Sequence, residues 1–261
     1  MTYKKQTNEA EYRAYGLLAG AKIPVPPVLH YDAQNSTLTL EDVSDRYVSG
    51  NTDWGRALEM LDTLADMHIA FWDNYDAFGK VGLPWRLDHP KNFAQHCKAM
   101  EKGIKPYCKA HKMDDKAFRQ ALNCFRTEMP KLLESRFHAG KNITVLHGDA
   151  HPGNILLPKE PQNQTMLVDL EAVRMGLAAE DLSMLFGLHI APEKAQAMPL
   201  LEHYYERLTK HIKSYAFETL LEDYRVALAE SLFFPQKLYL EGVANDTVMM
   251  SRALKAWADF G

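Results

Sequence analysis

Residues 145–171 contain short apolar runs separated by polar loops, within a chain whose remaining pattern is mostly helical. Two of these runs, Asn154–Leu157 and Met166–Val168, have strand length, and the polar turn between them predicts an antiparallel hairpin. Facing residues of a hairpin lie close together, so this pairing would bring Asn154 near Asp169. The segment therefore constrains the fold to a β insert between helices.

The polar residues of this segment are those that phosphoryl transfer needs. Asp149 can orient an attacking hydroxyl and accept its proton, while the Asn154 amide oxygen and the Asp169 carboxylate can hold magnesium on ATP phosphates. His147 is expected to anchor the loop by hydrogen bonding. The alternative is a plain hairpin whose Asp and Asn residues make turns. The spacing His-x-Asp-x-x-x-x-Asn, followed by an apolar strand that ends in Asp, favours the catalytic interpretation.

The N-terminal part of the chain predicts a helix followed by a strand hairpin. The helix covers Thr7–Ala19, with Asn8 as its capping residue, and the strands cover Val28–Asp32 and Thr37–Glu41. Residues 41–43 then leave the sheet as an extended segment. Such a segment can offer backbone groups to an adenine edge or can be a simple linker, and the sequence leaves both open.

The rest of the chain is predominantly helical in its hydrophobic spacing. A helix begins near Trp54, and its buried face includes His68, which we expect to be a hydrogen-bonded core histidine. A loop over residues 75–90 could border a pocket. Further helices are predicted over residues 92–111, 114–133, 179–189, 192–213, 216–234 and 246–260. The predicted class is α+β, with a small β-containing N-lobe over residues 1–43 and a large helical C-lobe over residues 44–261.

Composition excludes several classes of protein. A net charge of -4 gives no basic surface for nucleic acid, and 46% hydrophobic residues are typical of a soluble globular chain. The three cysteines match neither a disulfide framework nor a zinc pattern. No signal peptide or membrane-spanning run is evident. We expect a cytoplasmic protein without nucleic-acid or membrane partners, and its oligomeric state is not constrained.

Several motifs together resemble one known superfamily. The run His147-Gly-Asp-Ala-His-Pro-Gly-Asn154, with Val168-Asp-Leu-Glu171 and Glu180-Asp-Leu182, is similar to the motifs of the aminoglycoside phosphotransferase and choline kinase superfamily, which has a protein-kinase-like fold. Residues 64–72 resemble a helix of its choline-kinase-like and ecdysteroid-kinase-like branch. Residues 38–43 resemble the strand-to-hinge segment that meets adenine. The resemblance covers roughly residues 8–190.

This resemblance implies an ATP- and magnesium-dependent kinase that phosphorylates a hydroxyl of a small molecule. By it, Asp149 is the catalytic base, Asn154 and Asp169 bind magnesium, and Asp181 supports the order of the loop.

On the nucleotide side, the resemblance implies that Glu41 and Val43 flank the adenine through backbone atoms. Glu9 would be the helix acid that pairs with a strand lysine, for which Lys4 and Lys5 are the candidates. From the residues alone, Glu9 is equally explained by its favourable position at a helix N-terminus.

The N-lobe departs from the superfamily pattern. Two strands and a phosphate-covering turn normally precede the lysine strand, but few residues precede the first helix here and no glycine occurs before Gly16. Truncation, a late start and a short lobe all fit this pattern. Loss of phosphate contacts would cost activity, so the alternative function is a catalytically weak or inactive binding or regulatory module. A protein kinase is disfavoured, because no Ala-Pro-Glu segment follows Asp169.

Overall fold

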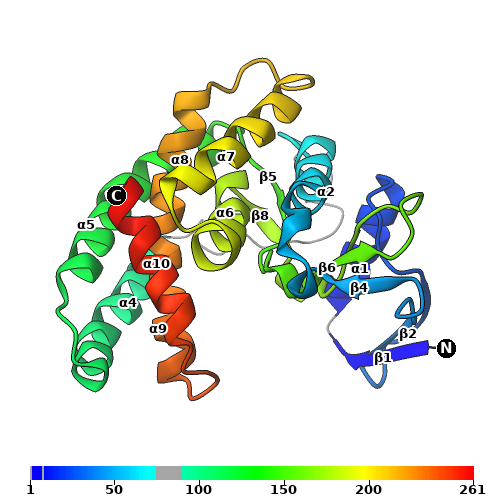
Figure 1. The fold of residues 1–261 in the computed structure, drawn as a ribbon, viewed down its shortest axis with the longest axis horizontal. Helices are drawn as coiled ribbons and strands as arrows, with labels where there is room; N and C mark the ends of the chain where they lie inside the picture. Colours follow the sequence, from blue (N-terminus) through cyan, green and yellow to red (C-terminus); the bar gives the residue numbers. More distant parts are fainter. Residues whose placement is uncertain (1, 8, 75–89) are drawn as a thin grey trace.

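The computed structural model describes residues 2–7, 9–74 and 90–261, in a small strand-bearing lobe and a large helical lobe (Figure 1). Asn8 and the predicted loop residues 75–89 lie outside the described residues. The strands are Thr2–Gln6 (β1), Val28–Asp32 (β2), Thr37–Glu41 (β3), Tyr47–Ser49 (β4), Thr144–Leu146 (β5), Ile155–Pro158 (β6), Met166–Leu167 (β7) and Arg174–Gly176 (β8). The α-helices are Glu9–Gly20 (α1), Ala57–Ala70 (α2), Pro90–His111 (α4), Lys116–Leu132 (α5), Ala178–Leu182 (α6), Lys194–Thr209 (α7), Phe217–Ser231 (α8), Phe233–Leu240 (α9) and Thr247–Phe260 (α10).

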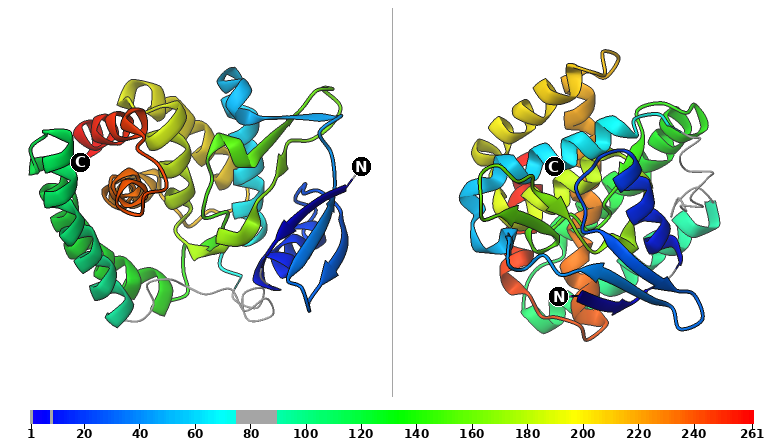
Figure 2. Two further views of the ribbon diagram at one scale, coloured as in Figure 1. Left: turned by 90° about the horizontal axis from the view of Figure 1, so that it is seen from below. Right: turned by 90° about the vertical axis from the view of Figure 1, so that its right-hand side faces the viewer.

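The N-lobe is a three-stranded antiparallel sheet with α1 packed beside it. Its strand order is β1-β3-β2, and the central strand β3 buries Leu38 and Leu40. Helix α1 buries Ala14, Tyr15 and Leu18, which recur at helical spacing. Figure 2 shows this lobe at one end of the molecule, with α4 and α5 at the other. The predicted strands β2 and β3 are confirmed with the same bounds.

Two small sheets form the β insert that carries the loops of interest. Strands β6 and β7 pair as an antiparallel hairpin, which confirms the predicted hairpin, and β4 extends that sheet on its other side. Strand β5 pairs with β8 in a separate two-stranded sheet. The loop of residues 147–154 leaves β5 and enters β6, while the loop of residues 168–173 joins β7 to β8. Both loops therefore start and end in the same insert.

The C-lobe core is helical and encloses a buried histidine. His68 is fully buried, and its Nδ1 lies 2.9 Å from the Tyr204 hydroxyl, which confirms the predicted core role. The helix predicted over residues 216–234 is two helices, α8 and α9. Pro235 lacks the N–H that would continue α8 past Ser231, and this explains the break. Among the described helices, none combines the length and apolarity needed to cross a membrane.

Candidate active site

The loop of residues 147–154 is held by a buried carboxylate in the short helix α6. Asp181 in α6 is 1% exposed, and its Oδ2 and Oδ1 accept the backbone N–H groups of His147 at 2.7 Å and Gly148 at 2.9 Å. Burial raises the pKa of Asp181, but the contact with His68 and neighbouring positive charge outweigh it and leave the pKa below its usual value. The charged carboxylate is thus an anchor for the loop backbone.

His147 links this loop to the strand that precedes Asp169. The imidazole is fully buried, and its Nε2 donates to the Val168 carbonyl at 2.9 Å. With that tautomer Nδ1 is an acceptor, and it receives the Asp149 backbone N–H at 3.3 Å. Burial lowers the pKa of His147, so the ring remains neutral. Its contacts are those of an anchor, in agreement with the expectation from the sequence.

Asp149 and Asn154 are hydrogen-bonded to each other across the loop. The Asn154 amide nitrogen donates to the Asp149 backbone carbonyl at 3.0 Å and to Asp149 Oδ2 at 3.2 Å. With its NH2 group engaged in this way, Asn154 presents its amide oxygen for a cation. The Asp149 side chain is 35% exposed, and the His151 Nε2 lies 3.7 Å from Asp149 Oδ2. Asp149 is therefore both held in place and accessible to a substrate.

Asp169 is joined to the N-lobe through a strand lysine. The Lys5 ammonium donates to the Asp169 carboxylate and, at 2.9 Å, to Glu11 Oε1. Glu11 is fully buried and also accepts the Leu170 backbone N–H at 3.2 Å. Burial lowers the pKa of Lys5, but the effect of the two carboxylates, which raise it, is larger. The pKa of Lys5 therefore lies above its usual value, and the ammonium stays charged. Lys5 thus connects β1, α1 and the loop after β7.

The assignment of Glu9 as the acid partner of the strand lysine is wrong. Glu9 is 62% exposed and pairs with Arg13 one turn along the helix, whereas Glu11 is the partner of Lys5. Residues two apart on a helix point about 200° away from each other, so only one of them can face the sheet. The sequence contained the signal, because Glu11 precedes Ala14, Tyr15 and Leu18 at steps of three, four and seven residues.

A cavity of about 360 Å³ is lined by residues of the N-terminal sheet, of the segment 40–49 and of the region of the β6–β7 hairpin. It brings together five residues predicted from the sequence, namely Lys5, Glu41, Val43, Asn154 and Asp169. The aromatic residues that also line it were not anticipated from the sequence; they are Tyr3, Tyr15 and Tyr47.

The backbone carbonyls of Glu41 and Val43 have different surroundings. Glu41 donates its N–H to the Pro27 carbonyl at 2.9 Å, and Pro27 has no N–H with which to return a bond. The Glu41 carbonyl therefore has no partner on that strand. The Val43 carbonyl, in contrast, accepts the N–H groups of Arg46 and Tyr47, both at 3.0 Å.

The predicted metal ligands, Asn154 and Asp169, are too few to complete a coordination shell by themselves. Among residues 2–7, 9–74 and 90–261, no cluster of three or more His, Cys, Asp or Glu side chains could hold a metal by itself. A cation at Asn154 and Asp169 would need phosphate and water oxygens to complete its shell. This matches magnesium, which keeps several waters and is held by few protein ligands together with phosphates.

The site matches one sequence family over most of the chain. A model described as "Phosphotransferase enzyme family" matches residues 2–215. No curated protein sequence gives a significant match.

Solved structures with a similar fold are small-molecule phosphotransferases. Choline kinase LicA from Streptococcus pneumoniae is 14% identical, with 98% of this chain and 85% of that chain covered and a TM-score of 0.59. An ethanolamine kinase from Plasmodium vivax is 11% identical, with coverages of 98% and 74% and a TM-score of 0.60. Aminoglycoside 2'-phosphotransferase-IIIa, solved with GDP, is 15% identical, with coverages of 96% and 80% and a TM-score of 0.58. LicA has also been solved with AMP. At these identities the likeness establishes the protein-kinase-like fold alone.

Proposed function

The chain belongs to the phosphotransferase enzyme family, and we propose that it is an ATP- and magnesium-dependent kinase that transfers the γ-phosphoryl group to a hydroxyl of a small molecule. The observation that carries this proposal is the Lys5 ammonium, which contacts both Glu11 of α1 and Asp169 of the loop after β7. In kinases, a strand lysine paired with a helix acid holds the phosphates, and a nearby aspartate holds the metal. Lys5 and Asp169 also line the interlobe cavity, where phosphates would meet them, while the fully buried Glu11 holds the Lys5 ammonium.

The nucleotide base is proposed to lie at the hinge, which we take as the boundary between the lobes of residues 1–43 and 44–261. The Glu41 carbonyl and the Val43 N–H would meet the adenine edge, and the Tyr3 ring, which lines the same cavity, offers a stacking surface. This placement directs the triphosphate towards Lys5 and Asp169. The AMP and GDP complexes of structures with this fold support nucleotide binding in this chain.

Asp149 is proposed to act on the acceptor side. Its carboxylate would orient the acceptor hydroxyl and take its proton as the new phosphoester bond forms. Asn154 holds that carboxylate by its amide nitrogen, while its amide oxygen and Asp169 would bind magnesium. When bound, magnesium would neutralise negative charge on the phosphates. Lys5 adds a fixed positive charge at the same place, which lowers the barrier without any rearrangement of the protein.

Two measurements test the proposal against the alternative of a binding or regulatory module. We expect magnesium-ATP to raise the melting temperature of the wild type, and we expect ATP turnover with at least one member of a panel of amino alcohols, aminoglycosides and sugars. Lys5→Met should weaken the thermal shift by magnesium-ATP, whereas Lys4→Met, on the same strand, should leave it unchanged. No turnover on any acceptor and no thermal shift with magnesium-ATP would refute the kinase and favour the binding or regulatory module.

A further inference from the structure

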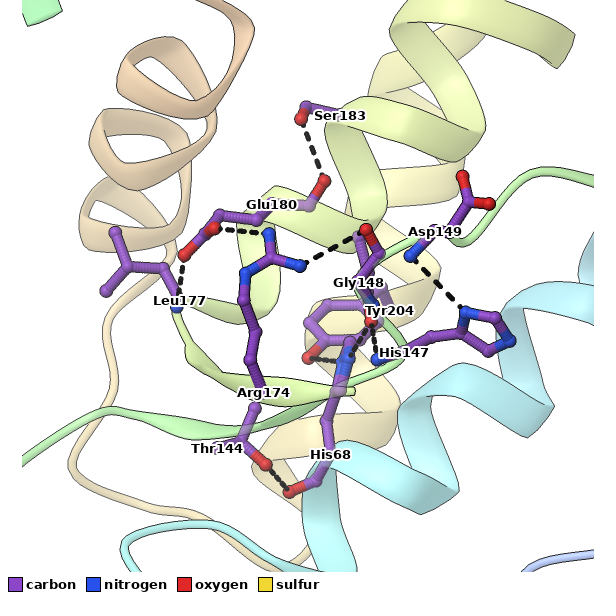
Figure 3. Close-up of polar contacts among 11 residues, drawn as sticks. His68, Thr144, His147, Gly148, Asp149, Arg174, Leu177, Glu180, Ser183 and Tyr204 are labelled. Atoms are coloured by element: carbon purple, nitrogen blue, oxygen red, sulfur yellow. Dashed lines mark hydrogen bonds and ion pairs between the residues drawn. The ribbon is translucent and has the colours of Figure 1, made fainter. Parts of the chain in front are cut away.

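The peptide unit that joins Gly148 to Asp149 is held at both of its polar ends. Arg174 of β8 donates from Nη1 to the Gly148 carbonyl at 3.1 Å, and the Asp149 N–H at the other end donates to His147 Nδ1 at 3.3 Å (Figure 3). The preceding peptide is fixed in turn by Asp181, which accepts the Gly148 N–H. The direction in which the Asp149 side chain leaves the loop therefore depends on these contacts.

The guanidinium of Arg174 occupies the space where a side chain at position 148 would lie. Gly148 has a left-handed backbone with φ of +81°, and a Cβ built there would overlap the Ala172 carbonyl oxygen and the Arg174 guanidinium. Only glycine combines this backbone conformation with so close an approach. The glycine and the arginine therefore form one arrangement, in which the charged group contacts the loop backbone directly.

Glu180 fixes the position of Arg174. Its Oε2 accepts Arg174 Nη2 at 2.8 Å, and its Oε1 accepts the Leu177 N–H at the start of α6 at 2.9 Å. The side chains of Arg174 and Glu180 are only 15% and 8% exposed. An arginine fork can bind two acceptors at a fixed angle, and a hydrogen bond from a charged donor is about twice as strong as a neutral one. Glu180 therefore acts through Arg174 on the 148–149 peptide, and the adjacent Asp181 holds the 147–148 peptide directly.

We propose that Arg174, held by Glu180, is a positioning residue for Asp149. By fixing the carbonyl of the 148–149 peptide, it sets the orientation in which the Asp149 carboxylate meets the acceptor hydroxyl. The inference rests on the proposed kinase function. Neither residue faces the nucleotide cavity, so their loss affects the chemical step and leaves ATP binding intact.

The test compares Arg174→Met/Glu180→Gln with the wild type. The double substitution removes both charges together, so that no unpaired charge stays buried, and the glutamine can still accept the Leu177 N–H. We expect kcat to fall roughly 100-fold, the scale of loss that a small misplacement of a catalytic group produces, with the KM for ATP near its wild-type value. Hydrogen exchange at the Asp149 amide should accelerate, and Arg174→Lys should give intermediate values of kcat and exchange.

A matched control is the double variant Arg136→Met/Asp223→Asn. This pair is similarly buried, with Arg136 Nη2 3.2 Å from Asp223 Oδ1, but it joins other parts of the C-lobe. The control should lower the melting temperature while kcat and exchange at the Asp149 amide stay at their wild-type values.

The exchange measurement does not depend on turnover, so the two proposals fail separately. A wild type that transfers no phosphate refutes the kinase function, and the exchange rate at the Asp149 amide still decides whether Arg174 orders the loop. Unchanged exchange in the Arg174→Met/Glu180→Gln variant overturns the positioning role. In an active enzyme, an unchanged kcat in that variant overturns it as well.

Discussion

Replacement of Glu11 should be far more damaging than replacement of Glu9, although the two acids lie in the same helical turn. The Glu11 carboxylate is buried and accepts hydrogen bonds from Lys5, from the Leu170 backbone and from the Thr7 hydroxyl. The Glu9 carboxylate is exposed and contacts only Arg13 among the partners that the structure gives it. The pair therefore offers an internal comparison between a site residue and a surface residue.

The size of the effect follows from the bonds that are lost. The charged bond from Lys5 contributes roughly 1.5–3 kcal/mol and each of the other two about 1 kcal/mol, so Glu11→Ala should lower the free energy of unfolding by about 4 kcal/mol. Glu11→Gln keeps acceptor capacity and loses the charge, so its cost should be about 1–2 kcal/mol. Glu9→Ala should change stability by less than about 0.5 kcal/mol, as is usual for an exposed ion pair.

Urea denaturation of the three variants measures these differences, and thermal shift with magnesium-ATP reports the consequence for the site. In Glu11→Gln, Lys5 would keep a neutral acceptor at position 11 but lose its ion pair there, and we expect nucleotide affinity to fall by about tenfold, which corresponds to 1.4 kcal/mol. Glu9→Ala should bind magnesium-ATP as the wild type does. Equal effects of the Glu9 and Glu11 substitutions on stability and on nucleotide affinity would refute the role assigned to Glu11.

Three further predictions address other parts of the site. Burial and nearby positive charge lower the pKa of His189 to about 4. Between pH 6.5 and 4, position 189 therefore binds a proton in the unfolded chain but not in the folded chain. The free energy of unfolding should fall as the pH drops through this range. His189→Gln should reduce that fall by at most about 3 kcal/mol in urea titrations, and an unchanged fall in this variant would contradict the assignment. Gly148→Ala should abolish turnover and cost about 2 kcal/mol or more, because the backbone is left-handed and the space is filled. Its control, Gly16→Ala in α1, has open space and should stabilise the fold by about 0.5–1 kcal/mol, as differential scanning calorimetry would show. Asp169→Asn should make ATP binding insensitive to magnesium in isothermal titration, and retained magnesium dependence would contradict its role as a metal ligand.

The sequence predicted those features that depend on local pattern. The β6–β7 hairpin follows from two short apolar runs and a polar turn, and the helices follow from their spacing. The spacing of Asp149, Asn154 and Asp169 predicted a shared site; in the structure Asn154 is hydrogen-bonded to Asp149 and lines one cavity with Asp169. Strands β1 and β4 were not predicted as separate strands, because they are short and lack an apolar alternation. Their conformation is set by distant partners, as in the pairing of Val48 with Leu157.

The remaining site residues depend on tertiary structure to different degrees. Glu11 could have been chosen over Glu9 from the helical spacing of the apolar residues that follow it. Arg174 was not predicted from the sequence, because its contact with Gly148, 26 residues away, forms only when β8 pairs with β5. Tyr3 is similar, because its place in the cavity depends on the pairing of β1 with β3, in which Tyr3 lies opposite Leu40.

Phosphorus NMR of the wild type and of Asp149→Asn, each with ATP, magnesium and the acceptor panel, tests the central claim most directly. The asparagine substitution preserves the shape of the loop but removes the group that accepts the hydroxyl proton. We predict a phosphoester signal and matching ADP with the wild type, and loss of that signal with Asp149→Asn while magnesium-ATP still binds. Equal phosphoester formation by both proteins, or none by a wild type that binds magnesium-ATP, would contradict the assignment of this loop as the catalytic centre of a small-molecule kinase.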